Sequence, residues 1–583
     1  MSIVAIDKKA SLCPNGLNKV QGSFSRQWLA LGLVMLVVGL LVLPPLYWLV
    51  RTSLTAFSLT GEASDFTLRY FKEALFEGDR AKFFFNSLLF AATSSMGAAI
   101  LGTTLAWLVE RTDIPLKWLP PNLSFVLFAV PGILKVTGWI LLLNKASGFL
   151  TVILATFLPA VLIPNIYGMG GMIFMQALLW TPVSFLLMAT AFHNMDPSLE
   201  EAARASGASG WGVMWRVTLR LALPSLLAVF LLCFIEGLTA LEVPLFLGMP
   251  SSVYTVTSAI YRTISTSRVP DFGMPCAMGV SLMSVVAVII LLYQRAVRVS
   301  SSFQTVTGKG FRPRRTTLGA WRPMGTAVVA ILCLLLAAPV FSLLWASFLE
   351  RVVHPLAIRE AMGALTLRHY AEAVTNEGLR QSVFNTLIIG VSSATGVAAL
   401  ALAVAWLLVR GRLRSVRWLD LLAAFPLVFP GILMAQGVLL THLRTPILPV
   451  YGTIWLLVLA YVPLFIPFGI RYVHAGLLSI HQELEESASA SGAAWWETIG
   501  RITVPLLRPA LVSAWLFTFL ISIRELNASI ILYGPRSQVI ATMLFDRWNE
   551  GSVGILSAFG MLIAVAAAAL GLIVRRVAGR LGM

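Results

Sequence analysis

The sequence predicts an all-α polytopic membrane protein made of two tandem six-span helical bundles. Three observations lead to this prediction: an apolar composition, about twelve apolar runs of span length, and an internal repeat. Of the 583 residues, 58% are hydrophobic and 12% are charged, whereas about a quarter of the residues in soluble domains are charged. The composition therefore excludes a soluble fold and indicates an integral membrane protein.

Runs of about twenty apolar residues are long enough to cross a membrane as helices. Those of the first half lie near 28–50, 85–109, 121–143, 170–192, 223–247 and 275–294. Those of the second half lie near 324–347, 383–409, 418–440, 451–472, 507–533 and 554–574. The first run is longer than a signal-peptide core, so we expect it to be retained as a span.

Basic residues gather in loops that this path places on the side of the N-terminus, among them 204–220, 295–322, 410–417 and 575–580. Because cytoplasmic loops are rich in Lys and Arg, both termini are expected in the cytoplasm. The net charge of +17 is spread over these loops rather than gathered on one polar domain. This distribution favours membrane lipids over nucleic acid as the partner.

One further apolar run, 149–166, is broken by Pro159 and Pro164. If it were a span, every later loop would change sides, and the region between Leu440 and Tyr451 is too short for a counterpart. We therefore expect an interfacial or re-entrant insertion on the outer side.

The two halves repeat each other in the same orientation. Pro131-Gly132-Ile133-Leu134 recurs as Pro430-Gly431-Ile432-Leu433, and 430 minus 131 is 299. A parallel repeat implies two similar halves about an axis along the membrane normal. The expected organisation is a tail over 1–26, a first half over 27–299, a basic cytoplasmic linker over 300–323 and a second half over 324–583.

Two polar loops, 193–222 and 478–506, also repeat, at an offset of 285 (486 minus 201). Each predicts a helix, a bend at a glycine and a second helix, with Asp196-Pro197 and Ser479 expected at the helix starts. Small residues let another backbone approach closely, so we expect a partner to bind twice. The residues concerned are Glu201, Ala202, Ala203 and Gly207, and Glu486, Ser487, Ala488 and Gly492.

The pattern Glu-Ala-Ala, three residues, Gly, nine residues, Ile-x-Leu-Pro resembles the cytoplasmic signature of the permeases of binding-protein-dependent ABC importers. The resemblance covers most of the chain as two fused halves, with Ser487 in place of an alanine and Arg220 in place of the proline. It implies a type I ABC importer permease fold in the bacterial cytoplasmic (inner) membrane. The implied partners are two ABC ATPase subunits, as a homodimer that receives the two loops as coupling helices, and a periplasmic or extracellular substrate-binding protein.

Residues 241–250 and 524–529 look like the fused permeases of the ferric-iron group. Ferric iron is therefore the expected substrate, and the related polyamine, thiamine and phosphonate permeases supply the alternatives.

Several motifs are absent from the sequence. No Gly-x-x-x-x-Gly-Lys-Ser/Thr occurs, so ATP must be hydrolysed by another chain and we expect no cofactor on this one. No His-Glu-x-x-His, Gly-x-Ser-x-Gly or metal-ligand cluster occurs either, which argues against an enzyme and leaves no metal site assigned. The four cysteines have no CxxC spacing and are expected to be apolar packing residues.

Ionisable residues inside spans are the candidates for a translocation path, since each costs about 2.5 to 3.5 kcal/mol at a helix centre. Carboxylates would suit a hard cation, whereas Arg524 would suit an anion or a chelate. An internal structural pair, such as Arg524 with Glu236, remains the alternative. The candidates are Lys135, Glu236, Glu242, Arg524, Glu525 and Asn527.

Alternating access is the expected mechanism. The resemblance implies that the binding protein delivers substrate to outer loops near 51–84, 249–274 and 350–382, and that closure of the ATPase subunits moves the coupling loops. An ion-gradient-driven secondary transporter of two six-span halves is the alternative from a different class. Such a protein would work alone and would need no paired docking loops.

Overall fold

The computed structural model describes residues 14–56, 66–155, 157, 159, 165–196, 198–266, 271–300, 316–350, 365–411, 413, 415–445 and 449–580. Within these ranges the chain is almost entirely helical, and pairing between extended segments is limited to three isolated bridges. The predicted all-α class is confirmed. The first half of the expected tail (1–13), the linker core 301–315 and Pro197 lie outside the described residues, while the second half of the tail is the start of helix α1.

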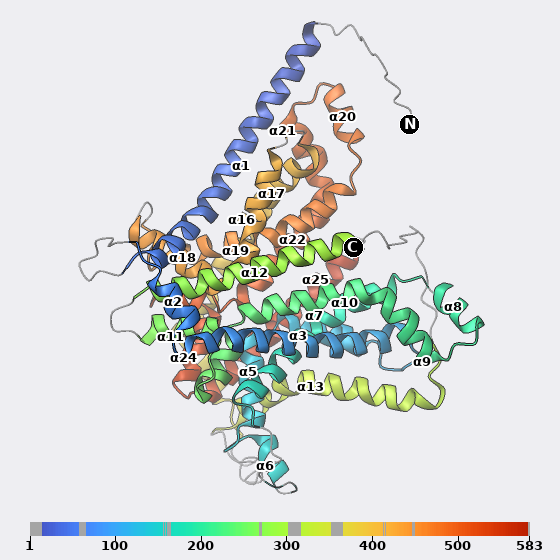
Figure 1. Cartoon of the computed structure of the whole chain (residues 1–583), viewed down its shortest axis with the longest axis vertical. Helices are drawn as coiled ribbons and strands as arrows, with labels where there is room; N and C mark the ends of the chain where they lie inside the picture. Colours follow the sequence, from blue (N-terminus) through green and yellow to red (C-terminus); the bar gives the residue numbers. More distant parts are fainter. Residues whose placement is uncertain are drawn as a thin grey trace.

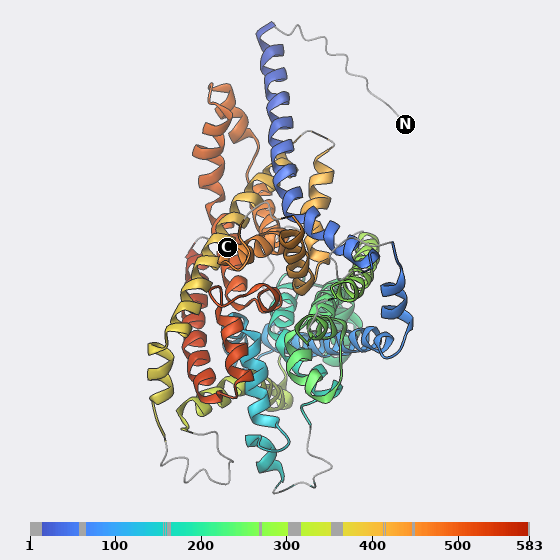
Figure 2. The same cartoon turned by 90° about the vertical axis from the view of Figure 1, so that its left-hand side faces the viewer.

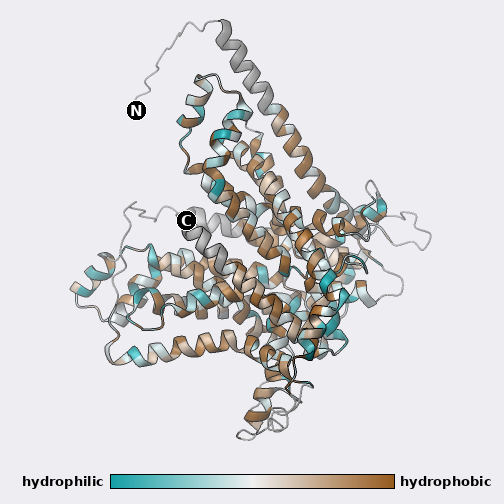
Figure 3. Ribbon diagram, turned by 180° about the vertical axis from the view of Figure 1, so that it is seen from behind, coloured by the Kyte–Doolittle hydropathy of each residue, from teal (hydrophilic) through white to brown (hydrophobic). Residues whose placement is uncertain are grey.

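Ten helices in the described part are long and apolar enough to cross a membrane. Figure 3 shows hydrophobic residues along these helices and hydrophilic residues at their ends. Each helix overlaps one predicted span. They are α1 (Pro14–Leu54), α3 (Arg80–Arg111), α7 (Met169–His193), α10 (Leu219–Thr239), α12 (Gly273–Ser300), α13 (Arg322–Phe348), α16 (Glu377–Arg410), α19 (Ile454–Leu478), α22 (Val504–Arg524) and α25 (Val553–Arg580).

The other two predicted spans, 121–143 and 418–440, are not single straight helices. The first is α4 (Leu119–Ala129) followed by α5 (Gly132–Leu143), bent by 107°; the second is α17 (Val416–Ala424) with the turn Phe425–Val428, followed by α18 (Gly431–Arg444), bent by 109°. A proline disfavours the helical region for the residue before it, and both Val130 and Phe429 are extended. The chain therefore turns sharply at each Pro-Gly pair.

The apolar run 149–166 contains the seven-residue helix α6 (Phe149–Ala155), and part of its remainder lies outside the described residues. Seven helical residues rise only about 10 Å, so α6 is too short to be a span. Its position relative to the membrane stays a prediction.

The long helices form two sets that diverge from a shared centre (Figure 1). In the first set α3 packs against α7 and α10, and in the second set α16 packs against α19 and α22. The first helix of each half crosses to the other half: α1 packs against α18, and α13 packs against α5. Figure 2 shows α1, in blue, running beside the orange helices of the second half.

A glycine makes each of these crossings close. A β-carbon at Gly138 of α5 would lie 2.3 Å from the carbonyl oxygen of Pro339 in α13, and one at Gly437 of α18 would lie 2.8 Å from that of Pro45 in α1. The hydroxyl of Ser342 also donates to the carbonyl of Gly138, at 2.8 Å. Only a residue without a side chain allows the backbones to approach this closely.

Short helices occupy the ends of the two sets. α8 (Ser198–Ala205) and α9 (Gly210–Val213) join α7 to α10, and α20 (Glu483–Ala490) and α21 (Trp495–Thr498) join α19 to α22 at the diverging ends (Figure 1). The remaining short helices are α2 (Arg69–Phe76), α11 (Val256–Thr266), α15 (Arg368–Thr375), α23 (Ser529–Leu532) and α24 (Ile540–Asn549).

Candidate functional site

The two matched loops have the same structure. α8 and α20 each have eight residues, and each is followed by a glycine in the left-handed region: φ is +87° at Gly207 and +89° at Gly492. Beyond each glycine a one-turn helix leads into a π-helical turn, Met214–Thr218 or Ile499–Thr503, and then into the long span. All these bounds differ by 285 between the copies, so Arg220 does not disturb the first one.

Most of the predicted coupling residues lie on the surface. Glu201, Ala202 and Gly207 are exposed in the first copy, as are Glu486, Ser487 and Gly492 in the second, while Ala203 and Ala488 are half-buried. Glu486 accepts a hydrogen bond from Gln482 at 2.9 Å. Asp196 accepts from the backbone of Ser198, as expected for a cap. The expected cap at Ser479 is wrong, because its hydroxyl donates back to the carbonyl of Gly476.

The residue before each predicted glutamate faces inward. Glu200 Oε1 accepts from the hydroxyl of Thr218 at 2.7 Å, and Oε2 lies 3.6 Å from Nη1 of Arg111, whose other terminal nitrogen donates to the carbonyl of Met195 at 3.1 Å. We call Arg111, Glu200 and Thr218 the first latch. Sequence reasoning missed it.

A second latch consists of Arg410, Glu485 and Thr503. Glu485 Oε1 accepts from Thr503 at 3.1 Å, Oε2 lies 3.3 Å from Nε of Arg410, and Arg410 donates to the carbonyl of Ile480 at 2.8 Å. Each group stands at the repeat offset from its counterpart, 285 for the glutamates and threonines and 299 for the arginines. This recurrence is the signal by which the sequence could have revealed the latches.

Both fifth-type spans end early, at the same point of the repeat. α10 ends at Thr239 and α22 at Arg524, so the expected spans 223–247 and 507–533 were too long. Glu242, Glu525 and Asn527 follow these helices instead of lying within them, whereas Glu236 lies in α10. The backbone carbonyl of Ala240 accepts a hydrogen bond from the hydroxyl of Thr257, and the backbone carbonyl of Glu525 accepts one from the hydroxyl of Tyr461. These bonds satisfy the irregular backbone inside the protein.

In each half this break packs against the Pro-Gly bend. A β-carbon at Gly132 would lie 1.7 Å from Oε2 of Glu242, and one at Gly431 would lie 3.1 Å from Cβ of Asn527. The structure thus brings Glu242 and Asn527, which stand at the repeat offset of 285, to equivalent places. Both are half-buried.

The two cations of this region bind backbone carbonyls at the end of α4. Lys135 is buried and its Nζ donates to the carbonyl of Leu127 at 3.0 Å. Arg524 donates to the carbonyl of Phe128 at 2.5 Å and stacks on its ring. Arg524 bridges the halves through a carbonyl freed by the bend, and it also attracts Glu236 electrostatically, so an internal structural pair stays a prediction.

The carboxylates do not form a closed metal site. Glu236, Glu242 and Glu525 are half-buried, and Glu525 accepts from the backbone of Ala528 at 3.0 Å. Among the described residues there is no group of three or more His, Cys, Asp or Glu side chains arranged to hold a metal ion. The arrangement suits passing contact with a cation better than tight binding.

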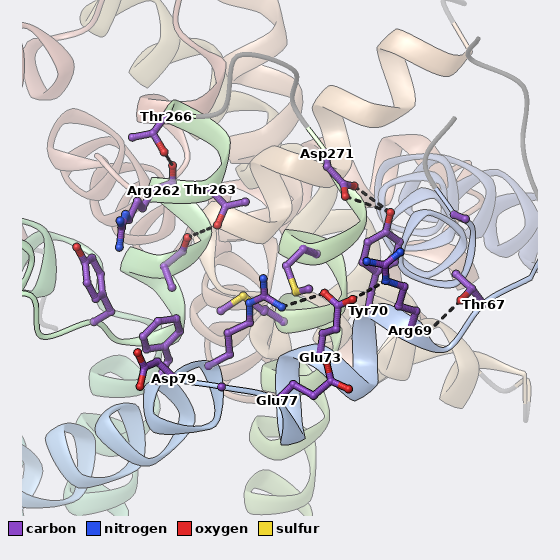
Figure 4. A pocket seen from close by; sticks show the side chains of 18 residues that line it. Thr67, Arg69, Tyr70, Glu73, Glu77, Asp79, Arg262, Thr263, Thr266 and Asp271 are labelled. Carbon is purple, nitrogen blue, oxygen red and sulfur yellow. Dashed lines mark hydrogen bonds and ion pairs between the residues drawn. The ribbon is translucent and has the colours of Figure 1, made fainter. Parts of the chain in front are cut away.

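An open cavity of about 860 Å³, lined by polar and apolar side chains, lies between α2, the start of α3, α11 and the start of α12. Figure 4 shows Arg69 and Glu73 paired within it and Tyr70 directed at Asp271. The hydrogen bond from Arg69 lowers the pKa of the Glu73 carboxyl, and a second bond from Arg80 acts in the same direction. All the lining residues except Met278 come from two of the expected outer loops, 51–84 and 249–274.

The sequence model of the family described as "Binding-protein-dependent transport system inner membrane component" matches residues 98–302, a range that contains α8 and the first latch. Residues 98–302 belong to that family. The internal repeat extends the same structure into the second half, which lies beyond the matched residues.

Relatives extend the likeness beyond the matched residues. The chain is 25% identical over 82% of its length to the ferric transport system permease protein FbpB of Actinobacillus pleuropneumoniae, of which it covers 69%. It is also 25% identical, over 45% of its length and 98% of the relative, to the 2-aminoethylphosphonate transport permease PhnV of Salmonella paratyphi A, whose substrate is itself a provisional assignment.

A crystal structure of a bacterial ABC transporter involved in the import of the acidic polysaccharide alginate aligns with 45% of the permease and 97% of that chain. The TM-score is 0.34 and the identity is 15%. A TM-score this low supports no conclusion about the fold or the function of the chain.

Proposed function

We propose that the permease is the transmembrane subunit of an ATP-driven importer, with α8 and α20 docked on two identical ATPase subunits in the cytoplasm. The observation that carries the proposal is the duplication of an exposed eight-residue helix, ended by a left-handed glycine, in both halves. A homodimer presents the same surface twice, which suits two matched helices. Both termini then lie on the cytoplasmic side, and the cavity beside α2 and α11 faces the binding protein.

The proposed path runs between the halves, past the Pro-Gly bends and the breaks after α10 and α22. Glu236, Glu242 and Asn527 offer half-buried polar groups there. Bends and breaks of this kind can change angle at little cost, because their backbone groups are already bonded outside the helical ladder. Alternating access would tilt the two sets about this region.

Ferric iron is the substrate we favour. Likeness to a ferric permease extends over most of the chain, and the path offers the carboxylates Glu236 and Glu242, which are hard ligands suited to ferric iron. A phosphonate is the second candidate, supported by the relative PhnV. Lys135 and Arg524 are the cations that would receive an anion, since a neutral carbonyl does not cancel their charge.

Charge reversal on the docking helices tests the proposal. The double variant Glu201→Arg with Glu486→Arg should lose co-purification with the ATPase from native membranes while the permease stays folded. The matched control, Glu77→Arg with Glu550→Arg, makes the same charge change at exposed positions away from α8 and α20 and should keep the ATPase. Retention of the ATPase by the first variant would contradict docking through these helices.

Energy source and substrate need separate measurements. In cells that lack the native permease, expression of this chain should restore uptake of radiolabelled ferric iron, and that uptake should stop when the ATPase partner is deleted. Uptake that persists without the ATPase would support a secondary transporter instead. Restored uptake of 2-aminoethylphosphonate without iron uptake would leave the importer proposal intact and replace its substrate.

A further inference from the structure

The two latches tie the surface helices to the spans. One carboxylate on α8 contacts two different long helices: Glu200 meets Arg111 at the end of α3 and Thr218 at the start of α10. Glu485 on α20 meets Arg410 of α16 and Thr503 beside α22 in the same way. Each arginine also holds the chain that enters the surface helix, at Met195 or Ile480.

The latch and the docking surface are on different faces of one helix. Successive residues of an α-helix point about 100° apart. Glu200 is therefore buried against Arg111 while Glu201 is exposed, and Glu485 is held by Arg410 while Glu486 is exposed. A force on the outer face of α8 or α20 reaches the spans through the inner carboxylate.

Burial makes this contact stiff. The side chains of Arg111 and Glu200 are 1% and 7% exposed, and those of Arg410 and Glu485 are 10% and 13% exposed. Charges held away from water are screened little, and separating such a pair leaves buried charge without a partner. The helix, the loop and both spans are therefore expected to move together.

We infer that Arg111–Glu200–Thr218 and Arg410–Glu485–Thr503 are positioning residues that transmit ATPase movement to the spans. This inference rests on the proposed function, because it takes α8 and α20 as the docking helices. It adds that the residue before each docking glutamate, together with its arginine and threonine, decides how much transport each ATP yields.

The sharpest test removes only the hydroxyls. Thr218→Val with Thr503→Val keeps side-chain shape and both charged pairs but loses the donors to Glu200 and Glu485. The complex should still contain its ATPase, but the amount of substrate moved per ATP should fall about fivefold or more, a typical size for coupling between sites. Thr218→Ser with Thr503→Ser retains both donors and should keep most of the wild-type ratio.

A second measurement does not depend on the ATPase. Amide hydrogen exchange of the isolated permease should be several-fold faster in residues 198–205 and 483–490 of the Val variant than in those of the Ser variant. Equal exchange and equal transport per ATP in the two variants would overturn the latch. Loss of the ATPase from the Val variant would also overturn it, since the hydroxyls would then serve docking. If the wild-type permease retained no ATPase, the proposed function would fail, and exchange alone would decide whether the latches hold α8 and α20.

Discussion

Arg524 of the second half donates a hydrogen bond from Nη1 to the carbonyl oxygen of Phe128 in the first half, at 2.5 Å, and its guanidinium carbon lies 4.5 Å from the centre of that ring. The carbonyl is available because the chain bends after Val130 and the helical ladder of α4 stops there. One side chain thus satisfies the end of a broken helix and joins the two halves.

Replacing this arginine should weaken the contact between the halves. Arg524→Met should lower the free energy of unfolding by about 1.5 to 3 kcal/mol, the usual worth of a hydrogen bond to a charged group. Arg508→Met, at an exposed position of the same helix, is the control and should change stability little. Thermal unfolding in detergent measures both, and equal losses would show that the bridge to Phe128 contributes nothing.

The contacts of α1 with α18 and of α13 with α5 should tolerate no added methyl group. Gly138→Ala and Gly437→Ala would each press a β-carbon against a proline carbonyl, and overpacking of this kind costs about 1 to 3 kcal/mol. Gly170→Ala in α7, where a β-carbon meets nothing within 4 Å, should be neutral or slightly stabilising. Unfolding midpoints that rank the three variants otherwise would argue against close backbone contact.

The glycine after α20 should matter for docking. Gly492→Ala forces an alanine into a left-handed conformation that costs about 1 to 2 kcal/mol, so the bend between α20 and α21 should relax and ATPase co-purification should fall. Gly500→Ala lies in the following π-helical turn, has no positive φ and meets nothing within 4 Å. It should retain the ATPase, and a similar loss in both variants would show that the bend is not the cause.

A methyl group at the first bend should displace a path carboxylate. In Gly132→Ala the new β-carbon meets the far end of the Glu242 side chain, which can swing aside at little cost to folding. We therefore expect near-normal stability but reduced substrate uptake. Gly32→Ala in α1 meets nothing and is the control; unchanged uptake in Gly132→Ala would remove Glu242 from the path.

Acid should loosen α2 from α3 through Glu73. Its folded pKa lies below the ordinary value of 4.5, so its stabilising contribution is fully present above about pH 4.5 and is lost as pH falls through the lower folded pKa. Amide exchange of residues 69–76 should accelerate over that window. Glu73→Gln should remove this acid-dependent step, whereas Glu77→Gln should retain it.

The positions of the spans could be predicted because length and hydropathy decide them locally. The bends could not be distinguished from straight spans, because apolar residues continue on both sides of Val130 and Phe429. The prolines that follow these two residues were the only local indication of a bend. The early ends of α10 and α22 depend on hydroxyls of Thr257 and Tyr461 that lie elsewhere in the chain. No local pattern indicates such partners.

The candidate site was predicted only on its outer face. Glu201 and Glu486 stood out because they match a family pattern, whereas Glu200 and Glu485 looked like ordinary loop charges. Their arginines lie at the ends of other spans, and only the packing shows that these groups meet. The packing of α1 against α18 and of α13 against α5 also depends on residues far apart in the sequence. An apolar helix surface does not specify which apolar helix it will pack against.

The crossing of α1 also sets an order of events during biosynthesis. α1 ends at Leu54, and its partner α18 begins at Gly431, 377 residues later (431 minus 54). At about 5 to 20 residues per second, the ribosome needs roughly 20 to 75 seconds to deliver that partner after α1 has been made. Until then α1 can be inserted in the bilayer and can meet α12, but it cannot reach α18, so for this helix insertion and final packing are separate steps in time.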